Sequence, residues 1–240
     1  MVRFADAQTE DWSWFEDMLA YDNARLPQAL IVTGLTTGTS AYVETGLKSL
    51  RWLVSVQTSR EGYFRPVGTE SFGTARSIPV AFDQQPIEAA ATISACLAAR
   101  RAEDSAEWAT EARRAFGWFL GENDLKTRLV DLITGSCCDG LHPDRANENR
   151  GAESAISYLV GLTEIRSLER DAELIRHKDA STPTNGAALR AVALRAIPEK
   201  KLVSVAILES PGSLLAPGSS QSRRQTVQAG DRTERPEPDR

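Results

Sequence analysis

The stretch DQQPIEAAATISACLAAR, residues 83–100, predicts the fold most clearly. Pro86 falls in the first turn of a predicted helix, where its missing N–H costs nothing. After it, apolar and small side chains recur at helical spacing, namely Ile87, Ala90, Ala91, Ser94 and Leu97. A second helical stretch, AEWATEARRAFGWFLGEN, follows over residues 106–123. Together the two stretches predict a helical hairpin.

An earlier part of the chain has the same pattern. Residues 22–35, DNARLPQALIVTGL, predict a helix that begins near Asp22 and carries Pro27 in its first turn. A partner helix is expected from about Ser40, with Thr39 or Ser40 as its cap. Its apolar face comprises Val43, Leu47, Leu50, Leu53 and Val54, with Trp52 beside them.

These two hairpins define a repeat. Asp22 and Asp83 lie 61 residues apart, and Leu50 and Phe116 of the second helices lie 66 residues apart. This period is longer than that of the tetratricopeptide or HEAT repeats, because each unit carries a long loop. Function is therefore to be sought in the loops that lead into the first helix of each unit.

A third unit begins in the stretch NENRGAESAISYLVGLTEIRSLE, residues 147–169. Its helix is expected to bury an apolar stripe made of Ala152, Ala155, Ile156, Leu159, Leu162 and Ile165. A partner helix for this unit is missing or degraded. Ahead of the first unit, DWSWFEDMLA at residues 11–20 predicts another short helix. The expected fold class is all-α.

Composition places a domain boundary near residue 170. Every aromatic side chain lies between Phe4 and Tyr158, whereas residues 171–240 are divergent and, from Pro211 onward, rich in Pro, Gly, Ser and charge. This tail is expected to be mostly disordered, with a short helix at residues 187–196 and a strand or sticky apolar run at residues 201–208. The folded domain is expected to occupy residues 1–170.

Several classes of function and location are disfavoured. A net charge of -5 without a basic stripe argues against nucleic acid as a partner. Three cysteines, two of them adjacent, and two histidines form no zinc-binding spacing, so no metal and no cofactor is expected. The N-terminus lacks a signal-peptide core and no apolar run is long enough to cross a membrane. A cytoplasmic protein with reduced thiols is expected.

Three long runs resemble a known family. They are DWSWFEDMLAYDNARLPQAL at residues 11–30, FDQQPIEAAATISACLAA at residues 82–99 and CDGLHPDRANENRGAESAISYL at residues 138–159. They are similar to the six-hairpin glycosidase-like domain found in the C-terminal region of bacterial group-1 glycosyltransferase proteins, over residues 11–168. This chain has Cys138 and Arg150 where relatives tend to have Tyr and Gln.

The resemblance implies an (α/α)6 toroid whose inner helices converge on a pocket lined by acids, amides and aromatics. The chain would supply part of this toroid. Relatives carry further hairpins upstream and, ahead of them, a nucleotide-sugar transferase domain. The implied ligand is a glycan or sugar, and a glycosyltransferase domain is an expected partner. A half-toroid would leave apolar surface exposed, so we expect marginal stability, oligomerisation or aggregation.

Glycoside chemistry requires two carboxyl groups, one protonated and one ionised, on either side of the scissile bond. The acids that the sequence offers are Asp22, Asp83, Glu153, Asp139, Glu88 and Glu16, of which the first four are the predicted catalytic candidates. Asp22 and Asp83 each have an equally simple interpretation as the N-cap of a helix. Glu88 and Glu153 have a similarly simple interpretation, as surface charges that offset a helix dipole.

Amides and one histidine complete the predicted site. The expected substrate-binding residues are Glu16, Asn23, Gln84, Gln85, His142, Asn147 and Asn149. His142 would act as a proton carrier, although a histidine before proline in a loop is usually an ordinary surface residue. Trp12, Trp14 and Phe15 either stack on a sugar or belong to the core, and Trp52 and Trp118 are expected in the core.

The sequence leaves three functions open. The first is a carbohydrate-processing enzyme that acts on a glycan. The second is a non-catalytic carbohydrate-binding module that serves a glycosyltransferase, or an inactive fragment. The third is a helical scaffold that binds protein.

Overall fold

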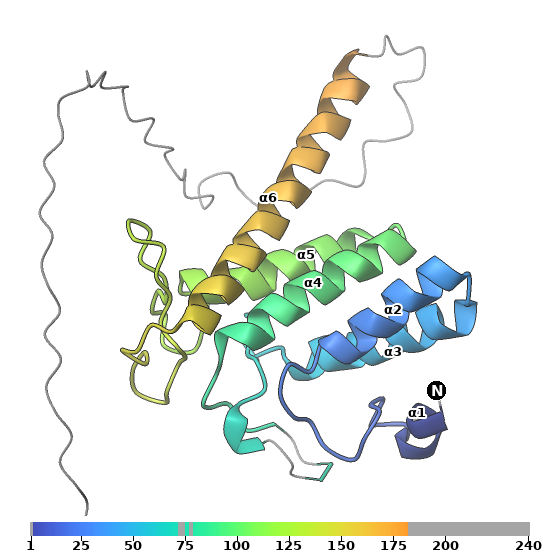
Figure 1. The fold of residues 1–240 in the computed structure, drawn as a ribbon, viewed down its shortest axis with the longest axis horizontal. Helices are drawn as coiled ribbons and strands as arrows, with labels where there is room; N and C mark the ends of the chain where they lie inside the picture. The colour runs from blue at the N-terminus through green and yellow to red at the C-terminus, as the bar shows by residue number, and fades with distance from the viewer. Residues whose placement is uncertain (1, 72–74, 77–78, 182–240) are drawn as a thin grey trace, which may run out of the picture. The chain divides into compact units, whose positions relative to one another are not determined.

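The computed structural model describes residues 2–71, 75–76 and 79–181, and this part of the chain is all-α, as predicted (Figure 1). Besides its helices it has only isolated β-bridges, which join Thr58 to Phe64, Gln84 to Leu141, Val130 to Cys137 and Leu141 to Ala146. The predicted disorder, helix and strand of residues 182–240 lie outside the described residues.

The first hairpin consists of α2 (Arg25–Thr37) and α3 (Ser40–Val56), which pack closely along their length. Gly38, in the left-handed conformation, ends α2 and donates its N–H to the Gly34 carbonyl. Close contact requires glycines on both helices. A Cβ on Gly34 would lie 2.7 Å from a methyl of Val43, and a Cβ on Gly46 equally close to Ile31.

The second hairpin consists of α4 (Pro86–Ala102) and α5 (Ala106–Gly117), and a short 3-10 turn, η2 (Trp118–Leu120), extends α5. Ser105 caps α5 by accepting the N–H of Glu107 at 3.3 Å. Alanines make α4 narrow, so α2, α5 and α6 all approach it closely and bury it on nearly every side (Figure 1). The predicted helix of residues 83–100 is therefore the centre of the core.

The last helix, α6 (Ala152–Ser181), packs against α4 and α5 and continues past the domain boundary predicted at residue 170. The predicted buried stripe is wrong in part, because Ile156 and Leu159 are exposed, whereas Leu162 and Ile165 are partly buried and pack against the core. The buried side chains of α6 include Ser154, Ser157, Tyr158 and Leu168, and a Cβ on Gly161 would lie 3.0 Å from Ile93 of α4. Small side chains thus allow the close approach.

The helix predicted at residues 11–20 is also wrong. This stretch is irregular, and the N-terminal helix is α1 (Val2–Ala7) instead. Trp12 and Trp14 are buried and pack against the half-buried Trp52, with ring centroids 4.8 and 5.7 Å away. Trp12 and Trp14 therefore belong to the core, which was the alternative to stacking on a sugar. Trp118 is fully buried, as expected.

The three cysteines, Cys96, Cys137 and Cys138, are buried free thiols. In the part of the chain that the structure describes, no helix has both the length and the apolar character required to cross a membrane.

Candidate functional site

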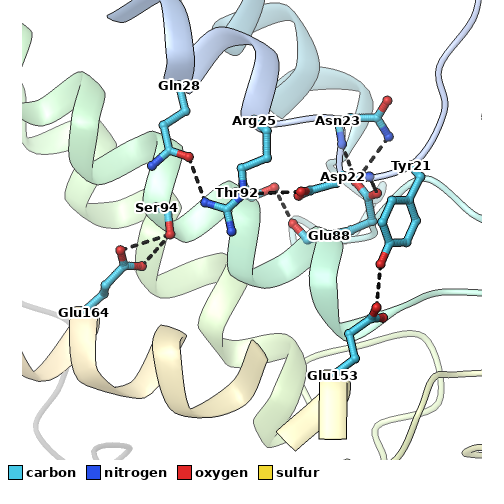
Figure 2. A network of polar contacts seen from close by, with 10 residues as sticks. All are labelled: Tyr21, Asp22, Asn23, Arg25, Gln28, Glu88, Thr92, Ser94, Glu153 and Glu164. Atoms are coloured by element: carbon cyan, nitrogen blue, oxygen red, sulfur yellow. Dashed lines mark hydrogen bonds and ion pairs between the residues drawn. The ribbon is translucent and has the colours of Figure 1, made fainter. Parts of the chain in front are cut away.

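The N-terminal ends of α2, α4 and α6 lie together, and polar side chains connect them (Figures 1 and 2). The connecting segment is Tyr21–Asn23, which ends one residue before the cap-to-helix boundary of α2, at Ala24. It lies between Glu88, in the first turn of α4, and Glu153, in the first turn of α6. Residues separated by up to 132 positions in the sequence thus meet at one place.

Glu88 is fully buried and binds the segment through both carboxyl oxygens. The backbone N–H of Asp22 donates to Oε1 at 2.5 Å, while the backbone N–H and the side-chain amide of Asn23 donate to Oε2 at 3.3 and 3.2 Å. Burial raises the pKa of Glu88 to about 7, against the opposing effect of these three donors. The interpretation of Glu88 as a surface dipole charge is therefore wrong.

Asp22 has a left-handed backbone with φ of 56°, which costs a non-glycine residue roughly 1 kcal/mol. Its Oδ2 lies 3.4 Å from Nε of Arg25, and its buried Oδ1 has no hydrogen-bond partner among the described residues. Burial raises the pKa of Asp22, Arg25 opposes the rise, and the neighbouring Glu153 adds to it. Asp22 is thus a half-buried acid whose pKa lies above its ordinary value.

Tyr21 links the segment to α6. Its hydroxyl donates to Oε2 of Glu153 at 2.8 Å, and both side chains reach the surface. Partial burial, together with the bond to Glu153 and the charges of Asp22 and Glu88, raises the pKa of Tyr21 to about 12. Tyr21 is consequently a hydroxyl donor at neutral pH and presents an aromatic ring beside two carboxyl groups.

The structure does not support N-caps at either predicted aspartate. Helix α2 begins after Ala24, and α4 begins after Gln85, in both cases without a side-chain cap. Instead, Oδ1 of Asp83 lies at hydrogen-bond distance, 2.7 Å, from Nδ1 of His142, and both side chains are partly exposed. The β-bridge between Gln84 and Leu141 brings the two together.

Asp139 has a structural contact. Its Oδ1 accepts the N–H of Gly151 at 2.5 Å and the hydroxyl of Ser154 at 2.6 Å, at the start of α6. The carboxylate thus binds one backbone N–H and one side-chain hydroxyl at the N-terminus of α6, where a negative charge also complements the helix dipole. Its predicted catalytic role has no geometric support, because this oxygen is committed to the helix.

Two of the predicted sugar-binding amides are buried in internal networks. Gln84 donates to Asp124 at 2.6 Å and accepts the indole N–H of Trp118 at 2.6 Å. Asn23 exchanges hydrogen bonds with the backbone of Ala20 and donates to Glu88. Both side chains are nearly inaccessible, so they shape the site without contacting a ligand.

The remaining predicted residues are dispersed. Asn147 accepts the N–H of the exposed Asn149 at 3.0 Å in a local turn, and the buried Oε1 of Gln85 has no partner among the described residues. Glu16 lies in a separate hollow of about 330 Å³ beside Asp17 and Arg76. The structure therefore brings Asp22, Asn23 and Glu153 together and places Asp83 with His142 as a second pair.

Sequence reasoning missed Tyr21 and gave Glu88 too little weight. The sequence did contain a signal for Glu88: it is a glutamate inside the alanine-rich stretch PIEAAATISACLAAR, and a charged group among buried residues needs buried partners. No local pattern singles out Tyr21. Among the described residues, no group of three or more His, Cys, Asp or Glu side chains is arranged to hold a metal ion.

No model of a known protein family matches the chain, and the comparison with curated proteins also gives no match.

Proposed function

We propose that this chain is a carbohydrate-processing domain, glycosidase-like or glycosyltransferase-associated, and that it binds a glycan at the N-terminal ends of α2, α4 and α6. The observation that carries the proposal is the cluster of Tyr21, Asp22 and Glu153 at this place. It combines two carboxyl groups in different surroundings with a hydroxyl and an aromatic ring, the groups that sugar chemistry uses.

The two carboxyl groups suit different roles. Asp22, whose pKa is raised by burial, would protonate the oxygen of the leaving group. Glu153 is exposed and accepts a hydrogen bond from the Tyr21 hydroxyl, and in this proposal it would act as base or nucleophile. The Asp83–His142 pair would contact a hydroxyl of the sugar or carry a proton.

The helix arrangement gives further support. Helix α4 packs between α2 and α6, while α3 and α5 are the second helices of their hairpins. In our proposal α2, α4 and α6 are inner helices of an incomplete six-hairpin toroid, as the family resemblance implies. The exposed apolar side chains of α2, which are Leu26, Val32 and Leu35, would pack against further hairpins.

A helical scaffold that binds protein is the second candidate. The observation in its favour is a hollow of about 380 Å³ on α6, lined by Ile156, Leu159, Val160, Thr163 and Glu164. Three of these side chains are apolar and exposed. This function would be indifferent to the charge of Asp22.

A thermal-shift screen of the whole chain distinguishes the glycan-binding function from the protein-binding scaffold. The screen uses a panel of neutral, acidic and amino oligosaccharides. The proposal expects at least one sugar to raise the melting temperature, and Asp22→Asn or Glu153→Gln to reduce that rise at least threefold. Asp104→Asn, an exposed aspartate between α4 and α5, is the matched control and should keep the full rise. A panel without any response, or a response that survives both substitutions, would exclude the proposed site.

A further inference from the structure

The contacts of Glu88 go beyond those of an ordinary buried acid. All three donors that reach its carboxyl group come from two consecutive residues, Asp22 and Asn23. One of them is the backbone N–H of the residue with the left-handed conformation. The contact to Glu88 is the restraint on this conformation that comes from a distant part of the chain, beside the local hydrogen bonds of Asn23 with Ala20 and of the Arg25 N–H with the Asp22 carbonyl.

The restraint is anchored firmly at its other end. Glu88 lies in the first turn of α4, the most buried helix, and the hydroxyl of Thr92 donates to its carbonyl oxygen at 2.8 Å. Its own N–H donates to the carbonyl of Gln85 at 3.2 Å. These contacts fix the backbone of Glu88 and complete burial confines its carboxyl group, so the position of Asp22 follows that of α4.

We propose that Glu88 is a positioning residue: its carboxylate fixes the backbone of Asp22 and Asn23 and thereby orients the Asp22 carboxyl group between α4 and Glu153. Glu88 does not touch the ligand, because it is fully buried. One part of the inference rests on the proposed function, namely that the restraint orients Asp22 toward a sugar. The restraint itself is a property of the chain alone.

Three N–H donors require an acceptor on both oxygens, so the ionised form of Glu88 holds the segment. Protonation converts one oxygen into a donor that would face other donors, and the restraint weakens. The charged group that acts on Glu88 is Asp22, and Asp22 is itself affected by Arg25 of α2 and Glu153 of α6. Positioning should therefore depend on pH around neutrality, where Glu88 titrates with a pKa of about 7.

The test is an NMR titration of the uniformly ¹⁵N-labelled whole chain from pH 5.5 to 8.5. We expect the amide protons of Asp22 and Asn23 to move downfield together as pH rises, with one midpoint near 7. In Glu88→Gln this shared transition should disappear, and in Glu88→Asp it should persist at reduced amplitude. The amide of Gly121, remote in sequence and at the end of η2, is an internal control that should not follow it.

The outcomes separate the two proposals. Amide shifts of Asp22 and Asn23 that are the same at pH 8 in the wild-type chain and in Glu88→Gln refute the positioning role, and Glu88→Asp provides the same comparison if Glu88→Gln does not fold. A transition that persists in Glu88→Gln refutes it as well. If the transition depends on Glu88 and no sugar binds, the positioning role stands and the proposed function fails. If a sugar binds, Glu88→Gln should weaken its binding at pH 8 by at least tenfold while Glu148→Gln, an exposed control, leaves it unchanged.

Discussion

Stability of this protein should depend on pH through one buried group, Glu88. Its pKa is about 7 in the folded chain, against an ordinary value of 4.5. Below pH 4.5 the carboxyl group is protonated in both the folded and the unfolded chain. Between 4.5 and 7 the folded chain keeps a proton that the unfolded chain has lost, so the free energy of unfolding falls as pH rises. Above 7 this loss is complete.

The size of the effect follows from the same two values. Each unit of pKa difference corresponds to about 1.4 kcal/mol, so a rise from 4.5 to about 7 corresponds to about 3 kcal/mol in all. Glu88→Gln keeps the shape of the side chain and removes the titration. Its amide can accept only on one oxygen, so it also loses hydrogen bonds from Asn23, which adds a cost of about 1 kcal/mol that does not vary with pH.

Urea unfolding followed by tryptophan fluorescence, repeated between pH 4.5 and 8, measures the difference. The quantity to follow is the unfolding free energy of the wild-type chain minus that of Glu88→Gln. We expect this difference to be largest at low pH and to decrease by about 3 kcal/mol toward pH 8. Glu148→Gln, which removes an exposed carboxylate, should run parallel to the wild type. Parallel curves for Glu88→Gln would show that Glu88 is not the buried titrating group described above.

Three further predictions concern packing and assembly. Asp124→Ala leaves the buried amide of Gln84 without its acceptor and should lower the unfolding free energy by about 2 kcal/mol in urea titrations; a loss below about 0.5 kcal/mol would contradict the network. Gly161→Val places side-chain atoms where α6 meets α4 and should lower stability by about 1–3 kcal/mol, seen as a reduced melting temperature; an unchanged melting temperature would refute close packing there. The whole chain should self-associate through exposed apolar surface, and Ile156→Ser with Leu159→Ser should shift sedimentation toward monomer; a wild-type monomer at all concentrations would oppose this.

The central helix α4 could be predicted from the sequence because its signals are local. Pro86 marks the first turn, and the alanines behind it allow close packing on every side. The buried face of α6 could not be predicted in this way. Hydrophobicity favoured Ile156 and Leu159, whereas the helix packs through Ser154 and Gly161, whose small size permits contact with α4. The buried face also includes the larger side chains of Tyr158 and Leu168, so small size and apolar character together decide which face of α6 is buried.

The candidate site was predictable only in part, since its contacts span distant parts of the chain. Asp22 and Glu153 stood out as acids at helix starts, and both belong to the cluster. Capping statistics assigned Asp22 to the helix, but the decisive contact joins its N–H to Glu88, 66 residues away. Likewise the burial of Gln84 against Trp118 depends on the fold, so its amide looked available in the sequence.

The most direct test of the central claim is to locate a bound sugar on the chain. The sugar that raises the melting temperature most is titrated into the ¹⁵N-labelled protein at pH 8, and amide shifts are followed. We predict the largest changes at Tyr21, Asn23 and Glu153, at the N-terminal ends of α2 and α6. Changes confined to the hollow on α6 that Ile156 and Val160 line, or no saturable change at any sugar concentration, would contradict a glycan site at these helix ends.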